Sequence, residues 1–160
     1  MADWQVNEKK AWFHKWWPEG VPFNLQFDKI SLGEFFEQQR KKYPNEKIMW
    51  FLESWMTYEE AGNAIDSLAT ALHDLGLKKG DVVGLVLPNS FQYVISFYAC
   101  TKIGVIVTGI NPTYKPLEIL HQIDITKIKV LITLDALYEE LIKPIIDKTK
   151  LEFIIYTNII

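Results

Sequence analysis

The sequence predicts an α/β fold in which a parallel sheet carries helices on both faces, preceded by helices and a short hairpin. The main observation is that four short apolar runs alternate with helical patterns from Val82 onward. Uncharged runs rich in β-branched residues are typical of strands that are buried on both faces. Strands and helices that alternate in this way imply right-handed crossovers and therefore parallel strands.

The elements of this alternating part can be placed from their apolar patterns. The expected strands are 82–87, 105–110, 130–134 and 153–157, and the expected helices are 90–103, 116–123 and 135–147. Pro116 falls in the first turn of its helix, where proline is well tolerated. Pro144 falls inside the last helix, which we therefore expect to kink or restart there. The last strand would leave one edge and one face of the sheet without a neighbour.

The first predicted helix and the hairpin lie before the sheet. The helix begins at Ser31, which stands in capping-box spacing with Glu34, and it ends before Pro44. Its apolar residues are expected on one face and are Leu32, Phe35 and Phe36. Two apolar runs around Glu53 and Ser54 then predict a hairpin whose turn lacks glycine.

The clearest helix of the chain follows the hairpin. Thr57 and Glu60 form a second capping box, and apolar residues recur every three or four positions after it. Gly76 is well placed to end this helix in the left-handed conformation. The pattern therefore predicts a long amphipathic helix from Thr57 to Gly76.

Composition limits the classes of function. The chain has 160 residues, of which 49% are hydrophobic and 23% charged, so one ordinary core is expected. The net charge of −3 and the pI of about 5.6 give no electrostatic reason to expect binding of nucleic acid. Cys100 is the only cysteine, and the first ten residues are polar, so we expect a cytoplasmic protein whose contact with membranes is at most peripheral.

The sequence contains no pattern that identifies a catalytic, cofactor-binding or metal-binding residue. The turn at 87–90 has no glycine that would let the backbone approach a phosphate, and Asn89 or Ser90 is better interpreted as a helix cap. Cys100 lies among apolar residues, which favours a buried, inert thiol. The histidines do not have metal-ligand spacing, and they are His14, His73 and His121.

The first thirty residues form an unusual arm. Four tryptophans are interleaved with lysines, and they are Trp4, Trp12, Trp16 and Trp17. Tryptophan and lysine at helical spacing can mark an anchor in the membrane interface. Rings that cover a surface of the same protein or of a second subunit explain the pattern better.

Several stretches together resemble the N-terminal part of AMP-forming acyl-CoA synthetases, within the adenylate-forming superfamily. "WPEGVP" (17–22) is similar to the Tyr-Pro-x-x-Val-Pro motif of long-chain fatty-acid ligases. "MTYEEA" (56–61) is similar to Leu-Thr-Tyr-x-Glu-Leu, with Ala61 as a departure. The stretch 76–123 is the most specific, because its Leu-Pro-Asn, Lys-Ile-Gly, Asn-Pro-x-Tyr and Leu-Glu-x-x-x-His-Gln motifs keep the family's order and spacing.

This resemblance implies a fatty-acid–CoA ligase as the parent enzyme. Such a ligase joins a carboxylate to ATP as an acyl-adenylate and then transfers the acyl group to CoA, so ATP, Mg²⁺ and CoA are implied for the parent. The family's phosphate loop, ribose-binding acid and catalytic lysine all follow the region that matches 1–160. We therefore expect this part to bind no cofactor and to be inactive alone. Long-chain acids are only hinted at, and aryl or medium-chain acids stay open.

The stretch "LEFIIYTNII" (151–160) looks like the strand after which a family member continues toward its phosphate loop. We therefore expect residues 1–160 to be one incomplete subdomain without an internal boundary, whose partner is the remainder of the same enzyme. Truncation, proteolysis and a split gene stay open as its origin. The alternative is a non-catalytic interaction module that assembles with a separate chain or forms a homodimer. A self-sufficient nucleotide-binding domain is disfavoured by the missing phosphate-binding turn.

Overall fold

The computed structural model describes residues 17–22 and 25–159. Contacts divide the chain into two units, Met1–Ile30 and Ser31–Ile160, which are treated separately. Most of the tryptophan-rich arm lies outside the described residues. Within the first unit, the Trp17 indole N–H donates a hydrogen bond of 2.8 Å to the carbonyl of Val21. No helix in the described part of the chain combines the length and apolarity that crossing a bilayer requires.

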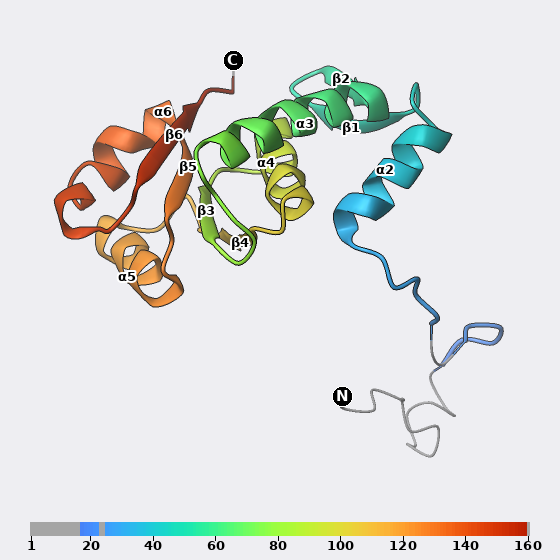
Figure 1. Cartoon of the computed structure of the whole chain (residues 1–160), viewed down its shortest axis with the longest axis horizontal. Coiled ribbons are helices and arrows are strands. Elements are labelled where there is room, and N and C mark those ends of the chain that lie inside the picture. Colours follow the sequence, from blue (N-terminus) through green and yellow to red (C-terminus); the bar gives the residue numbers. More distant parts are fainter. Residues whose placement is uncertain (1–16, 23–24, 160) are drawn as a thin grey trace. The chain divides into compact units, whose positions relative to one another are not determined.

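A four-stranded parallel sheet forms the centre of the second unit, as the alternating pattern predicts. Its strands are β3 (Val82–Val86), β4 (Ile106–Gly109), β5 (Val130–Leu134) and β6 (Phe153–Thr157). The order across the sheet is β4-β3-β5-β6, with β4 and β6 at opposite ends (Figure 1). All three pairings are parallel. Every residue of β5 is buried, which explains its uninterrupted apolar run.

Helices cover both faces of this sheet. On one face lie α3 (Tyr58–Asp74) and α4 (Phe91–Lys102), and on the other lies α5 (Pro116–Thr126). Right-handed crossovers require this division. Helix α4 connects β3 to β4, and α5 connects β4 to β5, which lies on the other side of β3. The two connections run in opposite directions along the sheet. Their helices must therefore occupy opposite faces.

The hydrophobic core is correspondingly split into two clusters. Residues of β3 and β5 alternate between them, because successive side chains of a strand point to opposite faces. Leu85 and Ile132 join the cluster beneath α3 and α4, while Val86 and Leu131 join the cluster beneath α5. All four side chains are at most 2% exposed.

Helix α3 begins and ends as its sequence predicts. The Thr57 hydroxyl accepts a hydrogen bond from the N–H of Glu60 at 3.2 Å, and the Glu60 carboxylate accepts one from the N–H of Thr57 at 2.8 Å. A cap of this kind contributes about 1 kcal/mol. At the other end, Gly76 has a φ of 88°, which is the left-handed stop expected there.

Helix α2 (Leu32–Lys42) is present, but its predicted apolar face is only partly buried. The Ser31 hydroxyl caps it by accepting a hydrogen bond from the N–H of Glu34 at 3.1 Å. Phe36 is buried in the core, whereas Leu32 and Phe35 are 54% and 50% exposed. Helical spacing predicts a shared face and not the presence of a neighbour, so it left the exposure of these two side chains open.

Arg40 fastens α2 to α3. Its guanidinium makes a two-pronged contact with the Glu59 carboxylate, at 2.8 and 3.0 Å. It also donates to Asn63 at 2.8 Å and to Asp66 at 2.9 Å. The group lies over Gly62, where an added Cβ would collide with it. Since the Arg40 side chain is only 14% exposed, this network holds the helix more firmly than an isolated surface pair would.

The predicted hairpin forms with its turn one residue earlier than expected. Strands β1 (Lys47–Phe51) and β2 (Ser54–Thr57) pair antiparallel, and the turn residues are Leu52 and Glu53. Their φ values are 46° and 62°, a conformation that favours asparagine or glycine. The turn was displaced in the prediction because neither residue carries the usual turn signal.

The segment between β5 and β6 is helical and restarts after Pro144, one of the two outcomes expected there, but its turns are mostly not α-helical. One short helical turn, α6 (Asp135–Leu137), leads into a π-helical turn, η1 (Tyr138–Ile142), and a 3₁₀ turn, η2 (Ile146–Lys148), follows. Pro144 explains the break, because a proline ring inside an α-helix clashes with the carbonyl of the residue four positions earlier. The N–H of Lys143 instead bonds to the carbonyl of Tyr138 at 2.9 Å.

Candidate functional site

The topology places a candidate site at the carboxyl edge of the sheet, between β3 and β5. The connection that leaves β3 runs toward β4, whereas the connection that leaves β5 runs toward β6 on the opposite side. Ligands of open α/β sheets bind outside the carboxyl ends of the strands at such a switch point. Val86 pairs with Thr133, so the turns after both strands leave the sheet at one level.

Two polar side chains at this switch point, those of Ser90 and Asp135, bind backbone groups close by in the chain. The buried Ser90 hydroxyl accepts a hydrogen bond from the N–H of Tyr93 at 3.3 Å and caps α4, as the sequence predicts. The Asp135 carboxylate accepts one from the N–H of Ala136 at 2.7 Å. These groups start the helices that follow the strands, and they form no acid–base pair.

Gln92 joins the switch point to the end of β6. Its side-chain amide donates a hydrogen bond of 2.7 Å to the carbonyl of Asn158, just beyond the strand. Its side-chain oxygen is buried and has no hydrogen-bond partner among the described residues. The sequence carries no signal for this contact, because the two residues are 66 positions apart and share no periodic pattern.

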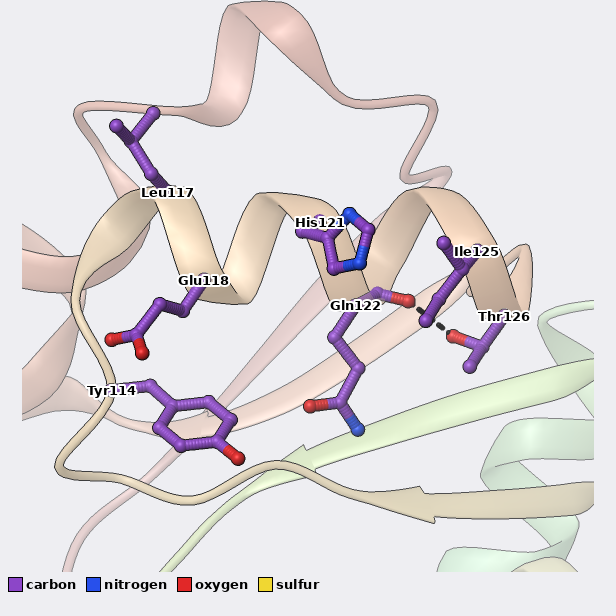
Figure 2. A pocket seen from close by; sticks show the side chains of 7 residues that line it. All are labelled: Tyr114, Leu117, Glu118, His121, Gln122, Ile125 and Thr126. Carbon is purple, nitrogen blue, oxygen red and sulfur yellow. Dashed lines mark hydrogen bonds between the residues drawn. The ribbon is translucent and has the colours of Figure 1, made fainter.

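A second concave surface runs along α5, beside β4 (Figure 2). This groove has a volume of about 560 Å³ and is lined by Tyr114, Leu117, Glu118, His121, Gln122, Ile125 and Thr126. Figure 2 shows Glu118 and Gln122 on the side of Tyr114, with Leu117 pointing away. Leu117 and Ile125 are 70% and 63% exposed, so the walls are apolar and open.

The polar groups of this groove also serve the fold. The Glu118 carboxylate accepts a hydrogen bond from the N–H of Lys115 at 2.7 Å, at the start of α5. The Gln122 amide donates to the hydroxyl of Thr108 and to the carbonyl of Gly109, both at 3.0 Å. The groove therefore offers an apolar surface without a group poised for chemistry.

The cysteine and the histidines singled out in the sequence do not come together at either surface. Cys100 is buried in the core as expected, and burial raises the pKa of its thiol to about 12, so it is a poor nucleophile. His73 lies on the exposed side of α3, His121 lines the groove, and His14 is outside the described residues. Within residues 17–22 and 25–159, no three His, Cys, Asp or Glu side chains are grouped to hold a metal ion.

Comparison with known proteins gives the family and the extent of the similarity. Residues 36–158 match the model of the AMP-binding enzyme family. A long-chain-fatty-acid–CoA ligase of Escherichia coli is 31% identical over 152 residues, which are 94% of this chain and 27% of that protein. One of Bacillus subtilis is 30% identical over 138 residues, which are 86% of this chain and 24% of that protein. The chain spans about a quarter of the length of these curated relatives.

Solved structures agree with this similarity in fold. A long-chain-fatty-acid-CoA ligase from Archaeoglobus fulgidus superposes with a TM-score of 0.76 at 28% identity, covering 84% of this chain and 28% of that one. An anthranilate CoA ligase, solved with anthranoyl-AMP, gives 0.76 at 27% identity, covering 80% of this chain and 25% of that one. The chain matches the N-terminal portion of acyl-CoA ligases, and it belongs to the AMP-binding enzyme family.

Proposed function

We propose that this chain is the N-terminal part of a ligase that joins a long-chain fatty acid to CoA at the expense of ATP. The observation that carries the proposal is the similarity to long-chain-fatty-acid–CoA ligases along 94% of the chain. An aryl acid is the second candidate substrate, supported by the equal structural similarity to an anthranilate CoA ligase. We further propose that the chain works in the cytoplasm together with the remainder of such an enzyme.

The described residues do not fit an ATP or Mg²⁺ site, although the family implies both for the parent enzyme. The switch-point turn after β3 contains no glycine, so its backbone cannot closely approach a phosphate. Its Ser90 hydroxyl and the Asp135 carboxylate after β5 are already bonded to backbone N–H groups. We therefore assign no catalytic step to these residues.

The contribution of this chain would be a rigid scaffold. Strands β3 and β5 are fully packed between two helical layers, and Gln92 fixes the exit of β6 beside the switch point. Precise placement of reacting groups depends on such rigid elements. We accordingly expect the isolated chain to be inactive and a complete ligase that contains it to be active.

Release of pyrophosphate tests the proposal. The isolated chain, supplied with ATP, Mg²⁺, CoA and either palmitate or anthranilate, should release none. The Escherichia coli ligase, with its matching segment replaced by this chain, should release pyrophosphate with palmitate and much less with anthranilate. A folded hybrid enzyme with neither activity would contradict the ligase assignment, and a preference for anthranilate would contradict the fatty-acid substrate.

A further inference from the structure

The helices on the two faces of the sheet have different outer surfaces. No large apolar side chain of α3 is exposed, and its outer side carries polar groups such as Asn63, Ser67 and Thr70. On α5, by contrast, Leu117 and Ile125 are among the most exposed aliphatic side chains of the second unit. A helix that faces water is polar on its outer side, so α3 has the surface of a solvent-facing helix and α5 does not.

The apolar side chains of α5 belong to a continuous strip. Leu117, His121 and Ile125 follow one another at intervals of four residues, so they form one ridge along the helix, and Figure 2 shows His121 between the other two. We call these three residues the α5 ridge. Isolated exposed aliphatic residues are ordinary on a protein surface, whereas a contiguous strip indicates a site of interaction.

Strand β4 extends this strip. Ile106 is 55% exposed and lies two residues before Thr108, so the two side chains point to the same face of the sheet. The Thr108 hydroxyl accepts a hydrogen bond from Gln122 of α5, which identifies that face as the one covered by α5. The apolar strip therefore continues from the α5 ridge onto the edge strand of the sheet.

The hydrogen-bonding groups beside the ridge are already used. The Glu118 carboxylate binds the N–H of Lys115, and the Gln122 amide binds Thr108 and the carbonyl of Gly109. The bond to Gly109 also occupies an acceptor that an added strand at the edge of β4 would need. The surface is thus suited to an apolar element that packs on the face of α5, and not to a polar ligand or a further strand.

The extent of the relatives indicates which element this is. The matched segments make up 27% and 24% of the Escherichia coli and Bacillus subtilis ligases, so about three quarters of such an enzyme is further polypeptide. A segment that is covalently attached has an effective concentration of roughly millimolar order, which an untethered second copy or another protein does not reach. Attached polypeptide is therefore the favoured occupant of the strip.

We propose that the α5 ridge packs against an apolar face of the remainder of a longer ligase, and that this contact joins the N-terminal part to the rest of the enzyme. The proposal rests on the proposed function, because it takes the chain as the N-terminal part of such a ligase. The α5 side of the sheet then becomes interior, whereas the α3 side stays in solvent. The enclosed His121 imidazole then requires a hydrogen-bond partner from the remainder.

Thiol labelling tests which face is covered. Leu117→Cys places a thiol on the α5 ridge, and Ala71→Cys places one on the exposed side of α3 as the matched control. In the isolated chain, both should react with a maleimide at similar rates, because both positions are exposed. In the Escherichia coli ligase whose matching segment is replaced by this chain, Leu117→Cys should react at least about tenfold more slowly and Ala71→Cys at an unchanged rate. Mass spectrometry of the labelled peptides separates these thiols from the buried Cys100 and from those of the ligase.

A charge at the same position gives a second measurement. Leu117→Lys should leave the melting temperature of the isolated chain unchanged, because the lysine stays in water. It should lower the melting temperature of the hybrid enzyme, because the lysine is then buried without a partner. Ala71→Lys is the control and should change neither value.

The isolated chain alone also tests the occupant. Labelling of Leu117→Cys should not depend on the concentration of the chain, because the ridge waits for attached polypeptide and not for a second copy. Labelling that slows as the concentration rises would show that a second copy covers the ridge, and it would overturn the proposal.

Two results in the hybrid enzyme would also overturn the proposal. Labelling of Leu117→Cys at the same rate in the hybrid as in the isolated chain would show that α5 faces solvent in the complete enzyme. Equal protection of Leu117→Cys and Ala71→Cys would remove the distinction between the two faces. Labelling does not require ligase activity, so a folded, inactive hybrid with a protected Leu117→Cys would contradict only the proposed function. An active hybrid with an unprotected Leu117→Cys would contradict only the packing.

Discussion

Strands β4 and β6 each pair with one neighbour, yet their free edges carry different chemistry. At β4, the N–H of Ile110 bonds to Leu85 at 2.9 Å, so the carbonyl of the preceding residue, Gly109, faces outward. The Gln122 amide donates to that carbonyl at 3.0 Å. An acceptor that another strand would need is therefore already used.

At β6, no side chain of residues 17–22 and 25–159 donates to an outward-facing carbonyl of the strand. Its outward groups at Ile154 and Tyr156 have no strand beside them in the described part of the chain. The tether from Gln92 reaches Asn158, beyond the end of the strand, and leaves the edge open. The comparison teaches that one side chain on a neighbouring helix can occupy a backbone acceptor at the edge of a sheet, as Gln122 does at β4.

The largest effect on stability is expected from a substitution in the core that supports both edge strands. Leu85 lies in β3, beside β4, and is fully buried. Leu85→Ala should lower the free energy of unfolding by about 2–5 kcal/mol, because it loses apolar contacts and leaves a cavity. Urea denaturation measures the change. Leu117→Ala, which removes an exposed side chain of α5, should cost little, and comparable losses would contradict the packing described.

A second variant should convert the β4 edge into one that resembles β6. Gln122→Leu frees the carbonyl of Gly109 and should cost about 1 kcal/mol of stability through the lost hydrogen bonds. It should also promote association, because the freed carbonyl can then accept a hydrogen bond from another strand. Light scattering detects the larger species. The neighbouring His121→Leu is the control, and equal association of both variants would count against the protective role of Gln122.

A smaller effect on stability is expected from a substitution of Gln92, and it should distinguish β6 from β4. Gln92→Leu removes the hydrogen bond to Asn158 but also removes a buried oxygen without a partner, so the two effects partly offset each other. The loss of stability should stay below about 1 kcal/mol. Amide hydrogen exchange should accelerate in β6 and remain unchanged in β4. Faster exchange in both strands would mean that Gln92 stabilises the whole sheet.

The smallest effect on stability is expected at acidic pH, from the ion pairs at the amino ends of β3 and β6. The Lys129 ammonium lies 2.9 Å from the Asp81 carboxylate and 3.8 Å from that of Glu152, so it links the segments before β3 and β6. The hydrogen bond from Lys129, followed by that from the N–H of Lys78, lowers the pKa of Asp81.

A carboxylate with a lowered folded-state pKa stabilises the fold above its unfolded pKa of about 3.9 and loses this contribution as the pH falls through the folded value. Asp81→Asn should therefore be less stable than the wild type at neutral pH, and the two should converge below about pH 4. Thermal unfolding across this range measures the difference. A gap that is independent of pH would show that the charge of Asp81 contributes nothing.

Much of this fold could be predicted because burial on both faces leaves a direct mark on the sequence. The expected bounds of β5 and β6 agree with the structure residue for residue. The caps at Thr57 and Ser90 were also predictable, because each satisfies backbone groups only three residues away. Such features depend on neighbours in the chain, and the sequence displays them.

The features that were missed depend on contacts between distant segments or on unusual local geometry. Leu52 and Glu53 form a turn in a conformation that their side chains disfavour, so no pattern marked it. The hydrogen bonds of Gln92 and Gln122 join elements that are adjacent only in the fold. At the candidate site, the sequence showed that the turn after β3 lacks the glycine of a phosphate-binding loop. It could not show which side chains hydrogen-bond to the ends of β4 and β6.

The contact between Arg40 and Gly62 has a consequence for how this protein can change over evolution. The guanidinium occupies the space that any side chain at position 62 would need. A larger residue there displaces Arg40 from Glu59 and Asp66, so Glu59 loses its ion pair and Asp66 keeps only the one with Lys102. Among homologous sequences, the two positions should therefore covary, with glycine retained wherever arginine is present and lost only where the arginine has been replaced.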